Sequence, residues 1–404
     1  MQVITIIDNF GETYKTMALT VGIIGLPQSG KTSLFNAITK SNAPVAGYST
    51  GSAQANIAMV NVPDDRVDRL TDMFQPKKKT YTTVEFVDVA GLRSAEDSAK
   101  PEGLNAEFIG HIRNANALAI VVRCFVNPSS AQASQPIRAA GDIADLLLTL
   151  ALTDIDTLTH RLERTVKSAK AGADKYQTEL DLLRRVIQEL ENGALASDLS
   201  YTAAEKAIID DLFLLTMKPR FYVANIAEDA LYAASSVLQQ AMETGVAPQT
   251  NSPETQAAAE IGLRARTEKA SAVAASARLE AELNELSPED AAEYLEALNL
   301  PQLGAGRVIQ AGYRSLQLVT FLTAGEDEVR AWTVREDSRA PVAAGKIHSD
   351  IEKGFIRAEV VAFDDLISCG SLAAAREKGL LRLEGKEYII KDGDIAHFRF
   401  NVTR

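Results

Sequence analysis

The sequence is poor in cysteine. Its two thiols, Cys124 and Cys369, are too few for a disulfide framework and do not form the CxxC spacing of a metal site. We expect buried thiols in a reducing compartment. No apolar run reaches the ~18–20 residues that a membrane-spanning helix needs. Residues 1–16 also lack the basic and apolar segments of a signal peptide. These absences predict a cytoplasmic protein without a membrane partner.

The sequence also has fewer basic than acidic residues. Lys and Arg number 42 against 54 Asp and Glu, so the formal net charge is −12. This balance argues against a diffuse cationic surface for nucleic acid and predicts no DNA specificity. Local basic clusters at 77–79 and 161–170 leave contact with RNA phosphates open. Solvated turns and helix faces are the alternative interpretation.

Short apolar runs, rich in branched residues, alternate with helical stretches over most of the chain. Each run is too short for a helix and is typical of a buried strand. We predict strands at 19–24, 57–62, 84–87, 117–122, 220–224 and 270–275. Such alternation indicates an α/β fold with a doubly wound, mostly parallel sheet.

A helical segment interrupts that pattern between about 145 and 192. Apolar residues recur every seventh position from Ile155 to Leu190, with a second row from Val166 to Ile187, which is coiled-coil spacing. The sequence Lys170-Ala-Gly-Ala-Asp174 in its middle favours an antiparallel hairpin, and one uninterrupted helix is the alternative. Further along, residues 243–260 are polar and predict a loop, whereas Ser287-Pro-Glu-Asp290 predicts a helix start.

After about residue 318 the sequence pattern changes and becomes typical of short strands and turns. We predict strands at 318–323, 329–334 and 388–391, and a turn at Lys391-Asp-Gly-Asp394. These features indicate a separate small α+β domain over 318–404.

The strongest motif is Gly25-Leu-Pro-Gln-Ser-Gly30-Lys31-Thr32, which matches GxxxxGK[ST] between a strand and a helix. In such a loop, backbone N–H groups face the phosphates, Lys31 reaches the β- and γ-phosphates, and the Thr32 hydroxyl binds Mg²⁺. A second motif, Asp88-Val-Ala-Gly91, follows the strand at 84–87. Asp88 is expected to hold Mg²⁺, and the Gly91 N–H to meet the γ-phosphate.

We expect the residues that follow the strand ending at Ala224 to recognise the base of the nucleotide. GTPases of this kind use NKxD there, but this chain has Asn225-Ile226-Ala227-Glu228. Replacing aspartate by the longer glutamate displaces the carboxylate that guanine requires. We therefore expect Asn225 to bond the base edge, Ile226 to pack on its face, and adenine to be favoured or tolerated. Ser276-Ala277 fits the loop that closes over the base.

Together these segments resemble the YchF/Obg-like ATPases, which are related to the Obg GTPases. The resemblance rests on GLPQSGKTSLFNAIT, EFVDVAGL, NIAE, KIHSDIEKGFIRAEVVAFDDL and LEGKEYIIKDGDIAHFRFNV, and it spans about 17–402. It implies a P-loop G domain at 17–144 and 205–317, an inserted helical arm at 145–204, and a TGS domain at 318–404. It also implies ATP preference and ribosome binding.

The chain departs from the family pattern at several positions. Residues Gln28 to Ser33 fall on the family's NVGKST, with Gln28 and Ser29 in place of Asn and Val; the Asn can help to hold potassium, so potassium is in doubt here. The switch residue for Mg²⁺ falls on Ser52, with Thr50 as a competitor. The residue that positions the attacking water is unassigned. Leu92 stands where many GTPases have glutamine. Ile120 stands where a histidine is sometimes found.

Two hypotheses follow. The chain is an ATP-binding and slowly ATP-hydrolysing switch acting on ribosomes, in translation or the stress response. Alternatively, it is a GTPase or a nucleotide-gated scaffold with incidental hydrolysis.

Overall fold

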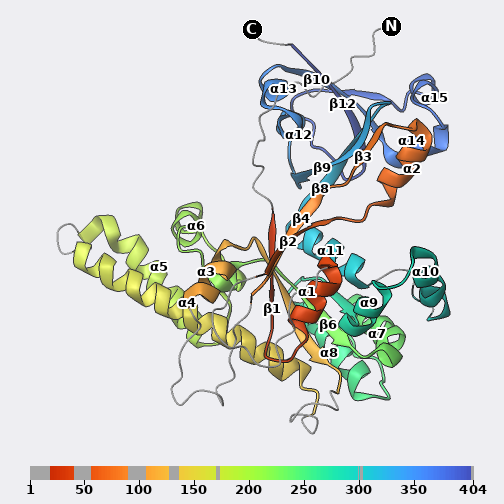
Figure 1. Ribbon diagram of the computed structural model, residues 1–404. Helices are drawn as coiled ribbons and strands as arrows, with labels where there is room; N and C mark the ends of the chain where they lie inside the picture. Colours follow the sequence, from red (N-terminus) through yellow and green to blue (C-terminus); the bar gives the residue numbers. More distant parts are fainter. Residues whose placement is uncertain are drawn as a thin grey trace. The chain divides into compact units, whose positions relative to one another are not determined.

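The computed structural model describes residues 19–40, 56–89, 106–126, 136–169, 173–298, 300 and 304–401, and every structural statement below concerns these residues. The chain forms two compact units. The larger unit comprises Leu19–Met59 and Glu85–Ser315, and the smaller unit contains Val60–Val84 and the chain from Leu316 onward. Figure 1 labels the helices and strands of both.

The larger unit is built on a six-stranded sheet in the order β2-β4-β1-β5-β6-β7. Strand β1 pairs in parallel with β4 and β5, β5 with β6, and β6 with β7. The strands are β1 (Thr20–Ile24), β2 (Asn56–Asn61), β4 (Thr83–Asp88), β5 (Ala117–Cys124), β6 (Arg220–Ile226) and β7 (Ala272–Ala275). The central strands are buried on both faces, which explains their continuous apolar sequences. The predicted doubly wound sheet is confirmed.

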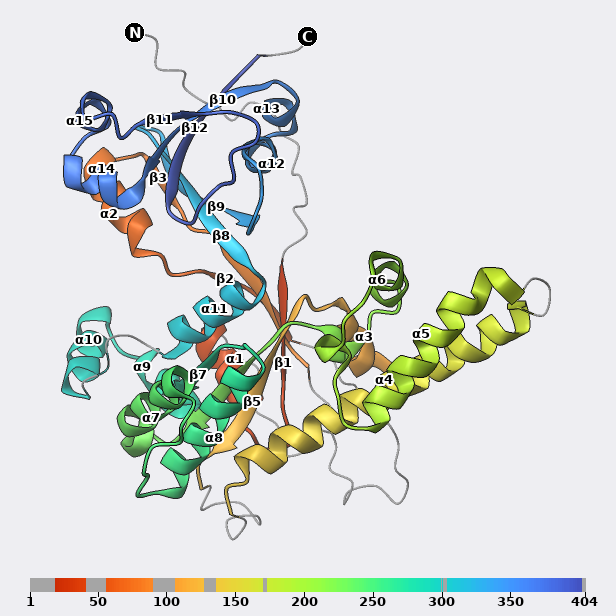
Figure 2. The same cartoon turned by 180° about the vertical axis from the view of Figure 1, so that it is seen from behind.

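Helices cover both faces of this sheet (Figure 2). On one face, α11 (Gly304–Ser315) packs beside α1 (Lys31–Thr39), and its Gly312 lies against Val21 and Phe221. On the other face, side chains of β5 and β6 form a core with α4 (Ala139–Ala169), α7 (Leu231–Thr244) and α8 (Pro253–Thr267). The other helices of this unit are α3 (Ala106–Asn114), α6 (Ala203–Asp210), α9 (Ala277–Leu283) and α10 (Pro288–Ala297).

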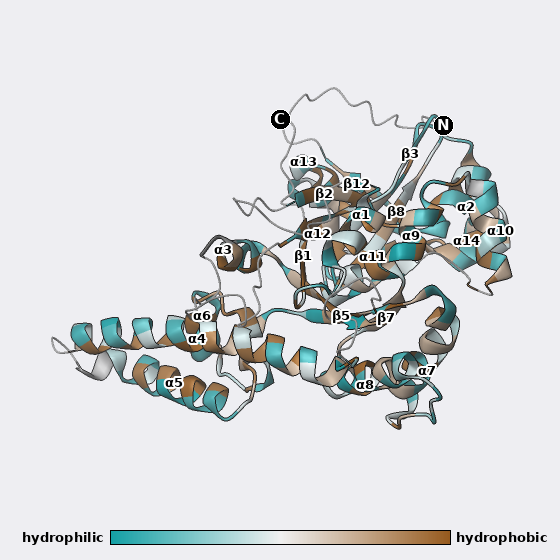
Figure 3. Ribbon diagram, turned by 60° about the horizontal axis from the view of Figure 1, so that its bottom comes forward, coloured by the Kyte–Doolittle hydropathy of each residue, from teal (hydrophilic) through white to brown (hydrophobic). Residues whose placement is uncertain are grey.

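The predicted helical hairpin is confirmed, and the single uninterrupted helix is not observed. Helix α4 packs along α5 (Ala173–Glu191), and both show hydrophilic and hydrophobic faces in Figure 3. Their shared core contains Leu158, Leu182, Leu183, Val186 and Leu190. Helix α4 begins at Ala139 rather than near 145, because its first turns, including Ile143 and Leu146, pack on the sheet. No helix in the described part of the chain is long and apolar enough to cross a membrane.

The smaller unit contains a second six-stranded sheet, in the order β11-β10-β12-β8-β9-β3. Two separate clusters of buried side chains include residues of its strands. The strands are β3 (Lys78–Thr80), β8 (Leu318–Ala324), β9 (Glu328–Arg335), β10 (Phe355–Ala362), β11 (Arg382–Glu384) and β12 (Asp394–Phe400). Its helices are α12 (Ala340–Ile347), α13 (Ser349–Lys353), α14 (Phe363–Cys369) and α15 (Leu372–Glu377).

The predicted strand at 388–391 is wrong. Only an isolated bridge between Arg339 and Ile389 occurs there, and the strand begins at Asp394. The reason is a side-chain-stabilised turn: the Asp394 carboxylate accepts hydrogen bonds from Lys391 N and the Tyr388 hydroxyl, each at 2.8 Å.

The smaller unit also takes a segment from the middle of the predicted 17–144 range. Helix α2 (Asp65–Phe74) and strand β3 belong to it, although they lie between β2 and β4 in sequence. Val67 and Leu70 of α2 are fully buried in a core with Leu322 and Val329. Strand β3 pairs in parallel with β9. The apolar side chains of α2 therefore pack against the sheet that the C-terminal strands form. No local sequence pattern indicates this packing.

Candidate functional site

The phosphate-loop motif forms the connection between β1 and α1, at the carboxyl end of the sheet. A Cβ atom at Gly25 would lie 2.4 Å from the Val121 carbonyl oxygen. Gly30 has a left-handed φ of 89°, and a Cβ atom there would lie 2.1 Å from Asn225 Nδ2. Both positions therefore exclude any side chain, as a loop that wraps closely around phosphates requires.

Lys31 lies across this loop. Its Nζ atom donates to the carbonyl oxygens of Gly25 and Leu26, both at 2.9 Å. Burial lowers the pKa of Lys31 to about 8, and the nearby Asp88 carboxylate partly opposes that shift. An ammonium group has three donors, so one remains for a phosphate oxygen.

Thr32 and Asp88 bring two oxygen ligands together beside Lys31. The Thr32 hydroxyl donates to Asp88 Oδ2 at 2.8 Å. Asp88 is 1% exposed, and burial raises the pKa of its carboxyl group. Its second oxygen, Oδ1, is buried without a hydrogen-bond partner in the described part of the chain. A hydroxyl beside a carboxylate with a free oxygen fits Mg²⁺, which prefers oxygen ligands. The predicted Ser52, its competitor Thr50, and Gly91 lie outside the described residues.

Asn225 connects the phosphate loop to the predicted base loop. Its Nδ2 atom donates to the Ser29 carbonyl at 2.9 Å, and its Oδ1 atom accepts from Ala277 N at 3.1 Å. Asn225 is 4% exposed and its amide joins the two loops, and its bond to the base edge stays a prediction. Ser276 caps α9 through a hydrogen bond from Leu279 N.

The other two residues of the predicted base segment have different surroundings. Ile226 is 1% exposed in the core of the larger unit, so its side chain is not available to pack on a base as predicted. It is the last residue of β6 and continues the alternation of that strand into the core. Glu228 is half-buried and accepts a hydrogen bond from the Tyr294 hydroxyl at 2.7 Å. No local pattern in the sequence indicates Tyr294, because it lies on a separate helix.

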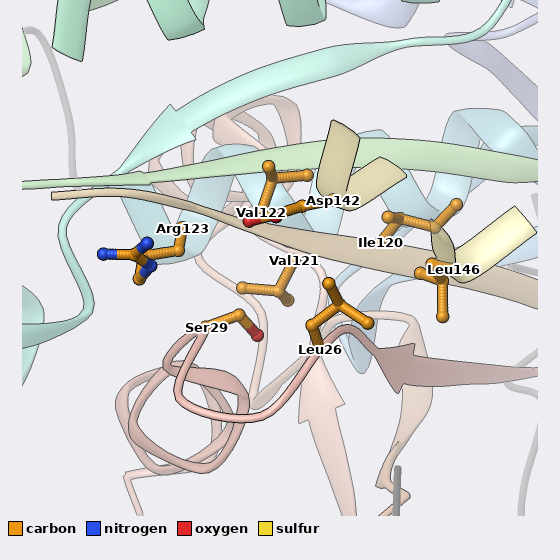
Figure 4. Close-up of a pocket in the computed structure, with 8 residues that line it drawn as sticks. All are labelled: Leu26, Ser29, Ile120, Val121, Val122, Arg123, Asp142 and Leu146. Carbon is orange, nitrogen blue, oxygen red and sulfur yellow. The ribbon is translucent and has the colours of Figure 1, made fainter. Parts of the chain in front are cut away.

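The remaining loop residues differ in exposure. Gln28 is exposed and has a left-handed φ of 61°, which asparagine tolerates better than glutamine. Ser33 is half-buried in the first turn of α1. Ser29 is 3% exposed, and its hydroxyl has no hydrogen-bond partner in the described structure. A cavity of about 10 Å³ lies beside it, shown in Figure 4 with the surrounding side chains of Leu26, Ile120, Val121, Val122, Arg123, Asp142 and Leu146.

The predicted basic cluster at 77–79 is paired with acids within the smaller unit. Lys77 contacts Asp327, Lys78 contacts Glu328, and Lys79 contacts Asp68, at 2.8 to 3.2 Å. These pairs favour a solvated surface over contact with RNA, and Lys78 and Lys79 lie in strand β3 rather than in a turn. No group of three or more His, Cys, Asp or Glu suitable for a metal ion occurs among the residues that the structure describes.

In a comparison with known proteins, two family models match two separate parts of the chain. The family model MMR_HSR1, described as a 50S ribosome-binding GTPase, matches residues 20–167. The model YchF-GTPase_C, described as a protein of unknown function (DUF933), matches residues 318–401. Among the relatives, "Ribosome-binding ATPase YchF" of Bacillus subtilis and that of Escherichia coli O157:H7 are each 40% identical over 386 residues, covering 96% of this chain and all of theirs. The structure of the Schizosaccharomyces pombe YchF GTPase is similar with a TM-score of 0.76 and 30% identity. The match covers 94% of this chain and 97% of that one.

The sheet order, the glycine-constrained loop and the Thr32–Asp88 pair define a P-loop protein of the nucleoside triphosphatase class. Similarity over nearly the whole length narrows this class further. The chain belongs to the YchF family.

Proposed function

We propose that this chain binds ATP with Mg²⁺ in the site between β1, β4 and β6, hydrolyses it slowly, and binds ribosomes in a nucleotide-dependent way. The observation that carries the proposal is the Asn225 side chain, which contacts both Ser29 of the phosphate loop and Ala277. This contact brings the lysine-free NIAE segment to the loop that would hold the phosphates. Relatives named ribosome-binding ATPases support the nucleotide and the partner.

The phosphate end of ATP would be held by the amides of the loop, whose residues are Gly25, Gln28, Ser29, Gly30, Lys31, Thr32 and Ser33. Lys31 carries the positive charge that offsets charge on the β- and γ-phosphates. Thr32, Asp88 and Ser52 would hold Mg²⁺, which supplies further charge neutralisation when bound. Gly91 would donate its N–H to the γ-phosphate.

The base end would lie near Asn225, Glu228, Ser276 and Ala277. Glu228 supplies a carboxylate, and the Ser276-Ala277 segment lies beside Asn225, which accepts a hydrogen bond from the N–H of Ala277. Because Ile226 is buried in the core, we do not assign it a contact with the base.

The chemistry we propose is in-line attack of water on the γ-phosphate, with Lys31 and the loop amides stabilising the developing charge. Ile120 is buried in the core, and Leu92 follows Gly91 where other enzymes place a glutamine. Without such a group to orient water, turnover should be slow. Slow turnover suits a switch that a partner accelerates.

A nucleotide titration tests the base assignment. We expect ATP and ADP to bind more tightly than GTP and GDP, and Lys31→Ala to weaken both triphosphates. A GTPase is the second candidate, because one solved relative is described as a GTPase. Tighter binding of GTP than of ATP would favour that candidate and contradict ours.

The partner and the compartment are tested separately. We propose that the smaller unit is a TGS domain and that the protein acts in the cytoplasm. We expect salt-resistant co-sedimentation with ribosomes that changes between ATP and ADP. Absence of the protein from the ribosomal pellet with every nucleotide would refute the partner while leaving the ATP site intact.

A further inference from the structure

A tyrosine on a separate helix holds the carboxylate of Glu228. Glu228 follows β6 directly, whereas Tyr294 lies in α10, which comes after α9 in the larger unit (Figure 1). The Tyr294 hydroxyl donates to Glu228 Oε1 at 2.7 Å. The Tyr294 side chain is 42% exposed, so the tyrosine is not needed to fill the core.

The position of Glu228 connects this hydrogen bond to the nucleotide site. Asn225, three residues earlier, is fixed between Ser29 of the phosphate loop and Ala277. Ala277 also begins α9, the helix that precedes α10. The carboxylate therefore belongs to a segment that borders the proposed base site, and Tyr294 holds it from a helix outside that segment.

The hydrogen bond from Tyr294 to Glu228 bears on the choice between guanine and adenine, because the two purines present different donors. Guanine presents two adjacent donors, N1–H and the N2 amine, and a carboxylate reads them with both of its oxygens. Adenine presents one exocyclic amine and needs one acceptor. In this structure Oε1 already accepts from Tyr294, which fixes the orientation of the carboxylate and uses one of the two lone-pair sites of that oxygen. We propose that Tyr294 is a specificity-determining residue that acts through Glu228 and disfavours guanine relative to adenine. This inference rests on the proposed placement of the base near Asn225 and Glu228.

The test is Tyr294→Phe in the full-length protein, with dissociation constants measured for ATP and GTP in Mg²⁺. We expect the preference for ATP over GTP to fall about tenfold, the effect of one hydrogen bond to a charged group. The free energy of unfolding should stay unchanged, because the ring is exposed. Tyr232→Phe is the matched control: Tyr232 is 61% exposed on α7, and its change should leave the preference as it is.

A second variant shows whether Tyr294 acts through the carboxylate. Glu228→Ala should also reduce the preference, and adding Tyr294→Phe to it should cause no further change. An additive effect would overturn the inference, as would an unchanged preference in Tyr294→Phe beside a reduced one in Glu228→Ala. The latter result would leave the proposed ATP function standing. A wild-type protein without preference for ATP would instead refute the proposed function, and the inference with it.

Discussion

The buried serine of the phosphate loop should weaken the fold. Ser29 is 3% exposed and its hydroxyl has no partner among the described residues, whereas the family pattern has valine at this position. We predict that Ser29→Ala stabilises the nucleotide-free protein. The backbone contact with Asn225 uses the Ser29 carbonyl and survives the change.

The magnitude follows from two opposing contributions. Removing an unpaired buried hydroxyl recovers about 1–3 kcal/mol of desolvation cost. The lost oxygen adds a void of on the order of 15 Å³, which costs about 0.4 kcal/mol at roughly 24 cal/mol per Å³. The net expectation is a gain of about 1–2 kcal/mol in the free energy of unfolding.

Urea denaturation followed by far-UV circular dichroism, without nucleotide, measures this gain. Ser276→Ala is the matched control, because Ser276 is equally buried but its hydroxyl accepts from Leu279 N at the start of α9. That change should destabilise by about 1 kcal/mol. If Ser29→Ala also destabilised the protein, the Ser29 hydroxyl would have a partner, such as a water in the adjacent cavity, and our reasoning would be wrong.

Three further predictions concern charged groups. Burial lowers the pKa of Lys31 to about 8 and a phosphate ligand needs the ammonium form, so the dissociation constant for ATP should be flat below that pH. Above it the constant should rise by up to about tenfold per pH unit; a flat profile in titrations up to about pH 9.5 would contradict the assignment of Lys31. Asp88→Asn should abolish the gain in ATP affinity that Mg²⁺ gives over EDTA, and persistence of that gain would remove Asp88 from the metal site. Asp154→Ala should destabilise the larger unit by about 3 kcal/mol, because the buried carboxylate accepts from Leu215 N, Thr216 N and the Thr216 hydroxyl. Exposed Asp156→Ala on the same helix should change the free energy of unfolding by less than about 0.5 kcal/mol, and equal losses in both variants would refute the role of burial.

Local signals in the sequence predicted helix starts unevenly. Ser287-Pro288 predicts a helix start, and α10 begins there. Ser252-Pro253 has the same pattern and begins α8, so the loop that polar composition predicts over 243–260 is wrong from Pro253 onward. Composition describes the average surroundings of a segment, whereas a cap satisfies particular N–H groups, so the capping residues were the better guide.

The sequence by itself determined the strands of the larger unit's sheet, the phosphate loop and the hairpin, because each depends on residues close together along the chain. The spacing of glycines, the β periodicity and the heptads all act within one element or between two neighbours. Only the tertiary structure placed α2 and β3 in the C-terminal sheet, tied Asn225 to the phosphate loop, buried Ile226, and set Tyr294 against Glu228. Those contacts join residues far apart in sequence, and the chain closes such distances only through packing of the whole core.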